Sequence, residues 1–283
     1  MDSKVSELKE VFFKRILVLS VISAIAFVIT GIALVFMPDQ VPMHYNVSGE
    51  IDRIGSKYEN YIFPAIIMAM NIFWIILIKV YDRKAEKAES DKVEKEAVNN
   101  SKILYWTAVA TSIFFIGMQI VLLWMAANAA GPADTSGTYD NIGKVSIIAM
   151  NVLMGFLFIF MGNMVPKAKN NRSFGVRTKW SMANDTTWRL SNRFGGRAMI
   201  ISGFVVIFLG FIPNMIIATY GMLVVIAVMT VACVVYSKKI YEQNKEAKSS
   251  PRQRGSDFVS QNKEAKSSPR QRGSDFASQN KED

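Results

Sequence analysis

The stretch FGVRTKWSMANDTTWRLSNRFGGR, residues 174–197, is a polar, aromatic and basic island between two strongly apolar segments. Residues 145–165 precede it and residues 198–212 follow it, and both segments are nearly free of charge. A helix of about 20 apolar residues crosses the ~30 Å hydrocarbon core of a bilayer. The second segment is shorter than that, so we expect its helix to begin upstream, inside the island. The island then joins two membrane spans at the bilayer surface.

The rest of the chain has the same organisation. Further apolar runs at 16–37, 61–80, 103–126 and 215–236 bring the expected spans to six. The first run is too long for the apolar core of a secretory signal, and no A-x-A cleavage motif follows it, so we interpret it as a retained helix. The single cysteine, Cys233, excludes a disulfide framework. The predicted fold class is all-α, a polytopic membrane bundle of six transmembrane helices.

The distribution of charge predicts the orientation of the bundle. The chain carries a net charge of +10 and 33 Lys and Arg residues. If the N-terminus is cytoplasmic, only Arg53, Lys57 and Lys144 fall on the outer side. So strong a bias follows the positive-inside rule and predicts an N-in, C-in orientation. Because this bias explains most of the positive charge, we expect no direct nucleic-acid partner.

These features divide the chain into four regions. Residues 1–15 are a cytoplasmic lead that we expect to extend the first helix, and 16–126 hold three spans with a structured extracytoplasmic loop at 38–60. Residues 127–236 hold three further spans and a cytoplasmic loop at 166–197. Residues 237–283 form an expected disordered tail with an 18-residue repeat, QNKEAKSSPRQRGSDFVS. The tail is interpreted as an unselected duplication; binding a partner or anionic headgroups is the alternative.

The first outer loop has the pattern of a compact structure. Val41, Met43 and Tyr45 alternate with polar positions, and Ser48-Gly49 offers a turn, which predicts a short strand and a return. His44 is the only histidine, and we interpret it as hydrogen-bonded within this loop. Contact with a ligand is the alternative. A metal site is not expected, because one histidine and one carboxylate, Asp52, make a poor set of ligands.

The spans contain amides but no charged residue well inside the hydrocarbon. Asn71, Gln119 and Asn151 are expected to hydrogen-bond between helices, and Gly117, Gly155 and Gly162 to permit close packing. Ion-coupled pumps and transporters place ionisable groups near mid-membrane, so their absence argues against such a function.

Helical spacing divides the island in two. Asn184 is a good N-cap, and Arg189, Arg193 and Arg197 recur every four residues beyond it, forming a basic stripe. The part before Asn184 is expected to be irregular, with Trp180 and Trp188 at the membrane interface. Between residues 167 and 197 eight basic residues face one acid, Asp185. Two interpretations stand: anchoring to anionic lipid, or a basic platform for an acidic protein partner.

Two ordered motifs resemble known families. The pattern G-x-R-T-x-W, a Trp eight residues on, and then N-R-F resembles the SdpI family of multi-pass bacterial immunity proteins. The pattern P-x-H-Y-N…G-x-x-D-R…S-K in the first outer loop resembles a bacterial domain of unknown function that often accompanies it. Lys179 stands where relatives commonly have proline, which restores a backbone N–H. The residues that the resemblance marks for cytoplasmic partner binding are Gly175, Arg177, Thr178, Trp180, Trp188, Asn192 and Arg193. Those marked in the extracytoplasmic loop are Pro42, His44, Asn46, Gly49, Asp52 and Lys57.

The resemblance implies protection of the cell from a secreted membrane-active peptide toxin on the outer side. It also implies signalling, in which the cytoplasmic face captures a transcriptional autorepressor. A small-solute transporter or channel-like protein without intramembrane charge is the alternative. No nucleophile–base pair, phosphate loop or metal-ligand spacing is present in the sequence, so we expect no enzyme, no cofactor and no metal.

Overall fold

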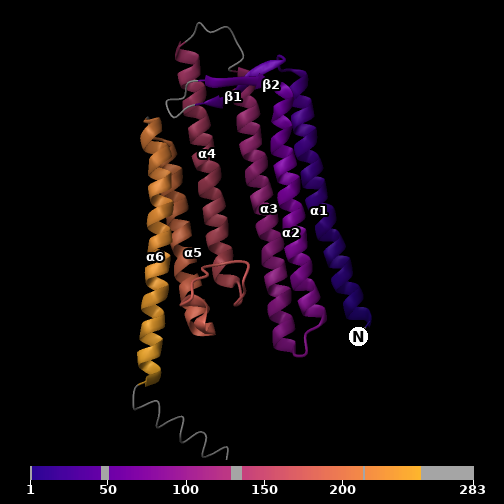
Figure 1. Ribbon diagram of the computed structural model, residues 1–283, viewed down its shortest axis with the longest axis vertical. Coiled ribbons are helices and arrows are strands. Elements are labelled where there is room, and N and C mark those ends of the chain that lie inside the picture. Colours follow the sequence, from indigo (N-terminus) through magenta and orange to yellow (C-terminus); the bar gives the residue numbers. More distant parts are fainter. Residues whose placement is uncertain (1, 46–50, 129–135, 213, 250–283) are drawn as a thin grey trace, which may run out of the picture. The chain divides into compact units, whose positions relative to one another are not determined.

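The computed structural model describes residues 2–45, 51–128, 136–212 and 214–249, and its elements are predominantly helical (Figure 1). The helices are α1 (Asp2–Val35), α2 (Ile62–Glu86), α3 (Asp91–Asn128), α4 (Ser136–Met164), α5 (Asp185–Gly210) and α6 (Met215–Ser249). Short 3₁₀ turns are η1 (Lys57–Tyr61), η2 (Val165–Lys167) and η3 (Ser181–Ala183). Among the described residues, six helices are long and apolar enough to cross a membrane, which confirms the predicted fold class.

The chain divides into a unit of residues Met1–Ile240 and a unit of residues Tyr241–Asp283. Within the first unit, α2 packs on α1 and α3, and α4 packs on α3 and α5. As expected, the lead is part of the first helix. α6 extends to Ser249, past the expected start of the tail at residue 237, and residues 250–283 lie outside the described part of the chain.

Buried amides tie α1, α2 and α3 together. The Asn71 side chain on α2 donates to the Leu19 carbonyl (3.3 Å) and to Ser23 Oγ (2.9 Å), and accepts from Ser112 Oγ on α3 (2.7 Å). Gln119 on α3 donates to the Ala26 carbonyl of α1 at 2.8 Å. In the hydrocarbon core such polar groups need hydrogen-bond partners from the protein, because no water is present to bond with them. The expectation of bonds between helices is confirmed for these two amides.

Asn151 is different. Its Nδ2 donates to the Ile147 carbonyl of its own helix (3.0 Å), so the expected bond between helices is wrong for this residue. Its Cβ instead packs on α5, where a Cβ built on Gly210 would lie only 2.8 Å away. The Asn151 N–H donor thus pairs with the carbonyl one turn back, as polar side chains in helices commonly do, while its Oδ1 is buried without a hydrogen-bond partner.

Glycines bring the backbones of α4 and α5 into contact. A Cβ on Gly155 would lie 2.5 Å from the Gly203 carbonyl oxygen, and one on Gly162 would lie 2.6 Å from the Gly196 carbonyl oxygen. Both distances are too short for any side chain, so only glycine fits. The pairs are seven residues apart on each helix, which keeps them on one face of an antiparallel contact. The expected close packing at Gly155 and Gly162 is confirmed.

A polar triad that the sequence did not reveal joins α1, α2 and α3 near their predicted cytoplasmic ends. Arg15 lies 3.4 Å from Asp82 Oδ1 and donates to Ser101 Oγ (2.6 Å), while Ser101 Oγ donates to Asp82 Oδ1 (2.5 Å). The Arg15 and Asp82 side chains are only 13% and 10% exposed. The charged run after Tyr81 is therefore no uniformly solvated helix: Asp82 is buried, and a turn at residues 87–90 separates α2 from α3.

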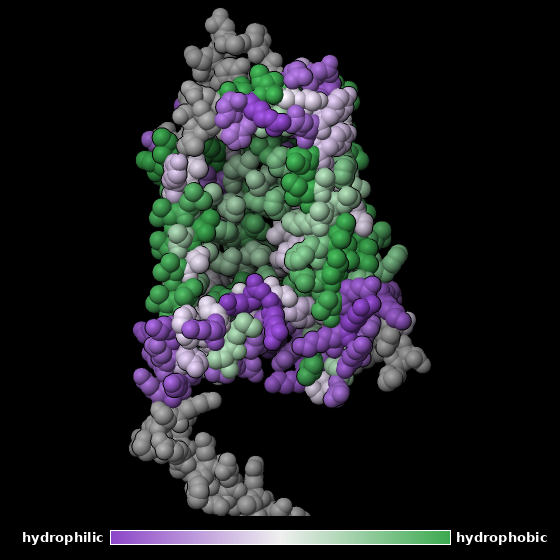
Figure 2. All heavy atoms as spheres, viewed as in Figure 1, coloured by the Kyte–Doolittle hydropathy of each residue, from purple (hydrophilic) through white to green (hydrophobic). Residues whose placement is uncertain are grey.

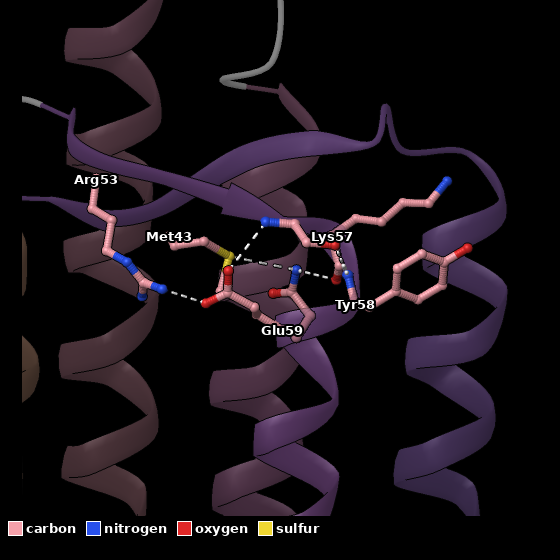
Figure 3. A network of polar contacts seen from close by, with 7 residues as sticks. Met43, Arg53, Lys57, Tyr58 and Glu59 are labelled. Atoms are coloured by element: carbon pink, nitrogen blue, oxygen red, sulfur yellow. Dashed lines mark hydrogen bonds and ion pairs between the residues drawn. The ribbon is translucent and has the colours of Figure 1, made fainter.

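The outer ends of the first spans carry an antiparallel hairpin, β1 (Gln40–Tyr45) paired with β2 (Ile51–Ser56). The strand predicted around Val41 is present, and Val41 is buried against Leu34, Met37 and Leu123 at the outer ends of α1 and α3. Figure 3 shows Arg53 pointing toward Glu59, to which it donates at 2.5 Å, and Glu59 also accepts from the Ser56 backbone at 3.1 Å. Ser56 caps η1, so the hairpin is joined firmly to α2.

Candidate functional site

The candidate site is the cytoplasmic segment, residues 166–197, which starts with a turn organised by Asn171. The Asn171 side chain accepts from the backbone N–H groups of Ser173 and Phe174 (2.8 Å each) and donates to the Lys169 carbonyl (2.7 Å). Tyr81 on α2 donates to Ser173 Oγ at 3.1 Å. The start of the segment is thus fixed by its own amide and by a neighbouring helix.

The middle of the segment is fixed to α5 by three residues of the family motif. Gly175 has φ +107°, a conformation open to glycine, and a Cβ there would collide with Asn192 Oδ1. That oxygen accepts the backbone N–H of Val176 at 2.8 Å. Trp188 Nε1 donates to the Ala168 carbonyl at 2.8 Å. Because Trp188 is only 3% exposed, the expectation that it anchors the membrane interface is wrong. Its buried side chain instead joins α5 to the start of the segment through the bond to Ala168.

Thr178 forms a tight local turn with Ser181. The Thr178 backbone donates to Ser181 Oγ (2.8 Å), the Ser181 backbone donates to Thr178 Oγ1 (3.0 Å), and Ser181 Oγ also donates to the Val176 carbonyl (2.7 Å). Immediately afterwards Asn184 caps α5 by accepting from the Thr187 backbone (2.9 Å), which confirms the predicted N-cap. The segment therefore has a defined conformation up to the first turn of the helix.

The arginines of the segment point outward. Arg177 is exposed and donates to the Arg172 carbonyl, and the stripe of Arg189, Arg193 and Arg197 on α5 is exposed as predicted. Lys179 lies over the Trp180 ring, with Nζ 5.0 Å from its centroid, and Trp180 is partly buried. This exposed set, Arg172, Arg177, Lys179, Arg189, Arg193 and Arg197, is called the basic face below.

Buried and exposed motif residues thus have different roles. Gly175, Trp188 and Asn192 fold the segment, and Thr178 shapes its turn, while Arg177 and Arg193 are available for contact. Sequence reasoning missed the supports from outside the motif: Asn100 accepts the Lys169 backbone N–H (2.9 Å), and Asn171 and Ser181 organise the turns. The Asn-Asn pairs at 99–100 and 170–171 were the available signal for these supports. Asn side chains often form hydrogen bonds with backbone groups at turns, in place of a backbone partner.

The predicted outer residues lie on the hairpin and just beyond it. His44 Nδ1 is 2.6 Å from Asp52 Oδ1, and both side chains are exposed, in agreement with a hydrogen bond within the loop. Pro42 is buried, and Lys57 donates to the Met37 carbonyl (3.2 Å) and pairs with Asp39 (3.1 Å). Asn46 and Gly49 lie outside the described residues. Among the described residues, no group of three or more His, Cys, Asp and Glu forms a metal cluster.

Comparisons with known proteins match both regions. Residues 167–237 match the SdpI/YfhL protein family, and residues 21–68 match a domain of unknown function, DUF1648. The chain is 21% identical to the Immunity protein SdpI of Bacillus subtilis (strain 168) over 240 residues, which cover 84% of this chain and 99% of that protein. No solved structure matches.

These matches coincide with the two structured polar regions. The SdpI/YfhL match covers almost the whole cytoplasmic segment together with α5, and the DUF1648 match covers the hairpin with parts of α1 and α2. The order of the two matches is the one expected from the motifs. The predicted resemblance is therefore confirmed: the chain is a multi-pass protein of the bacterial cytoplasmic membrane whose residues 167–237 match the SdpI/YfhL protein family.

Proposed function

We propose that the protein is an integral membrane immunity protein that protects the cell from a secreted membrane-active peptide. Similarity to the Immunity protein SdpI of Bacillus subtilis supports this class, and the match extends over nearly the whole of that relative. The observation that carries the proposal is that some motif residues of the cytoplasmic segment fold it while others are exposed. Buried Trp188 and Asn192, together with half-buried Gly175, hold a defined conformation whose exposed part is basic. Anchoring to lipid does not require such a fold, whereas recognition of a partner does.

The basic face is proposed to bind an acidic surface of a cytoplasmic partner, with a membrane-sequestered transcriptional repressor as the partner class. Arg177 and Arg193 belong to the motif and are exposed. Arginine forms bidentate bonds with carboxylates, which gives geometric specificity as well as charge attraction.

The outer hairpin is proposed to meet the peptide. Ile54 and Tyr58 are 64% and 63% exposed at the end of the molecule that faces outward in the predicted orientation. They offer exposed apolar surface on β2 and on the adjoining η1. Because η1 joins the hairpin directly to α2, a peptide bound there favours one arrangement of the helices over another, and this links the two sides.

The test is a survival assay in cells that lack the gene, complemented with variants and challenged with a panel of membrane-permeabilising secreted peptides. Wild type restores survival, and Ile54→Ser with Tyr58→Ser abolishes it. Arg177→Gln with Arg193→Gln leaves protection intact but weakens membrane recruitment of the partner by at least about tenfold, from the ~1 kcal/mol expected of each lost contact. Lys84→Gln with Lys87→Gln is the charge-matched control. Unchanged killing across the whole panel with and without the gene refutes the immunity function.

A further inference from the structure

A lateral groove between α3 and α4 lies outside both polar regions. Its volume is about 660 Å³, within the ~300–1,000 Å³ of ligand clefts. Its walls are apolar and include Ile113, Phe156 and Phe160, with Ile113 and Phe156 about 60% exposed. Figure 2 shows apolar side chains gathered around a hollow between the hydrophilic bands at the two ends of the helices.

The groove occupies one half of the membrane. It follows α3 from Trp106 to Phe114 and α4 from Leu153 to Asn163. In the predicted orientation α3 runs outward and α4 runs inward, so both stretches lie in the cytoplasmic half of their spans. An open apolar groove at this depth is filled by something from the inner leaflet, since water has no partners there.

Its inner end is polar and positive. Asn163 is in the groove lining, and Lys167 follows it by four residues, in η2. On α3, Lys102 precedes the lining residue Trp106 by four residues, so Lys102 and Trp106 lie on one face of that helix. Both lysines are exposed. Asn99 donates to the Lys167 carbonyl at 3.0 Å, so α3, which carries Lys102, is in contact with η2, which carries Lys167. No ion pair joins either lysine to a carboxylate in the described part of the chain.

We propose that this groove binds one anionic phospholipid of the cytoplasmic leaflet. An acyl chain lies along the apolar walls between α3 and α4. The headgroup phosphate lies at the inner end, where Lys102 and Lys167 supply positive charge and Asn163 supplies an amide donor. Apolar walls that end in paired cations complement a lipid with an anionic head, and an aromatic residue at the mouth, Trp106, is typical of headgroup depth.

Native mass spectrometry of the full-length protein in detergent, with phosphatidylglycerol and phosphatidylcholine added in equal amounts, tests the site. Wild type retains one phosphatidylglycerol in preference to phosphatidylcholine. Lys102→Gln with Lys167→Gln lowers that preference roughly 30-fold, at ~1 kcal/mol for each lysine near a charged headgroup. Lys84→Gln with Lys87→Gln removes the same charge at the end of α2 and keeps the preference.

Filling the groove tests the acyl-chain half of the proposal. Ala110→Trp places an indole among the lining residues and abolishes retention of both lipids, while thermal unfolding in detergent checks that the variant is folded. The lysine variant is on the surface and tests the proposal even if Ala110→Trp does not fold. Equal lipid retention by wild type and a folded Ala110→Trp overturns the site. An equal loss of the phosphatidylglycerol preference in both lysine double variants also overturns the site. The same holds if wild type retains a second chain or a peptide in place of lipid and Ala110→Trp releases it.

Discussion

Replacing Gly175 by alanine isolates the element that holds the cytoplasmic segment in its conformation. The residue has φ +107°, and a new Cβ would collide with Asn192 Oδ1. Forcing alanine into this backbone region costs about 1–3 kcal/mol. Displacing the Asn192 side chain also removes the bond from the Val176 N–H, which costs about 1–3 kcal/mol if the buried group stays unpaired. The expected total is about 2–6 kcal/mol, all of it local to the segment.

Limited digestion with trypsin measures this local opening. Arg172, Arg177 and Lys179 lie around Gly175, and cleavage tracks the open population when the segment closes faster than it is cut. A cost of at least about 2 kcal/mol raises the rate of cleavage at these sites roughly 30-fold or more in Gly175→Ala. Gly31→Ala is the matched control, because its Cβ would meet only Tyr61 Oη at 3.4 Å. Equal cleavage rates in the two variants would refute the role of Gly175.

Two further predictions concern the bundle. In the buried pair, Arg15→Met or Asp82→Leu alone lowers the free energy of unfolding in detergent by about 3–5 kcal/mol, whereas the double variant stays within about 1 kcal/mol of wild type. Additive losses in this mutant cycle would show that the pair does not interact. Gly203→Val separates α4 from α5 by opposing the Gly155 backbone, and lowers the thermal midpoint far more than Gly117→Ala, whose Cβ meets only a movable Leu153 side chain. Equal midpoints would contradict backbone contact.

The sequence predicted the features that depend on composition along the chain. Long apolar runs gave the six helices, the Asn184 pattern gave the start of α5, and alternation around Val41 gave a strand of the hairpin. Each of these signals is local, because burial in lipid or a helix cap selects residue types over a short range. Their agreement with the structure reflects that locality.

The features that depend on pairing across the chain were less accessible. Arg15 and Asp82 are 67 residues apart, and each lies beside a charged stretch where it resembles an ordinary solvated residue. Trp188 has the composition of an interface anchor, yet an acceptor 20 residues away places it in the interior. In the candidate site the motif marked a segment that has a defined conformation in the structure, but only the contacts separated residues that fold it from residues that face outward.

The glycine pairs between α4 and α5 have a mechanical consequence. Two backbone contacts, seven residues or about 10 Å apart along each helix, allow neither helix to slide, because a shift by one residue would press a side chain against a carbonyl. We therefore expect α4 and α5 to move together as one rigid pair. We expect a tilt at the outer end of α4 to move the inner end of α5, where Arg193 and Arg197 are exposed. The proposed coupling between the two sides of the membrane would act through this pair of helices.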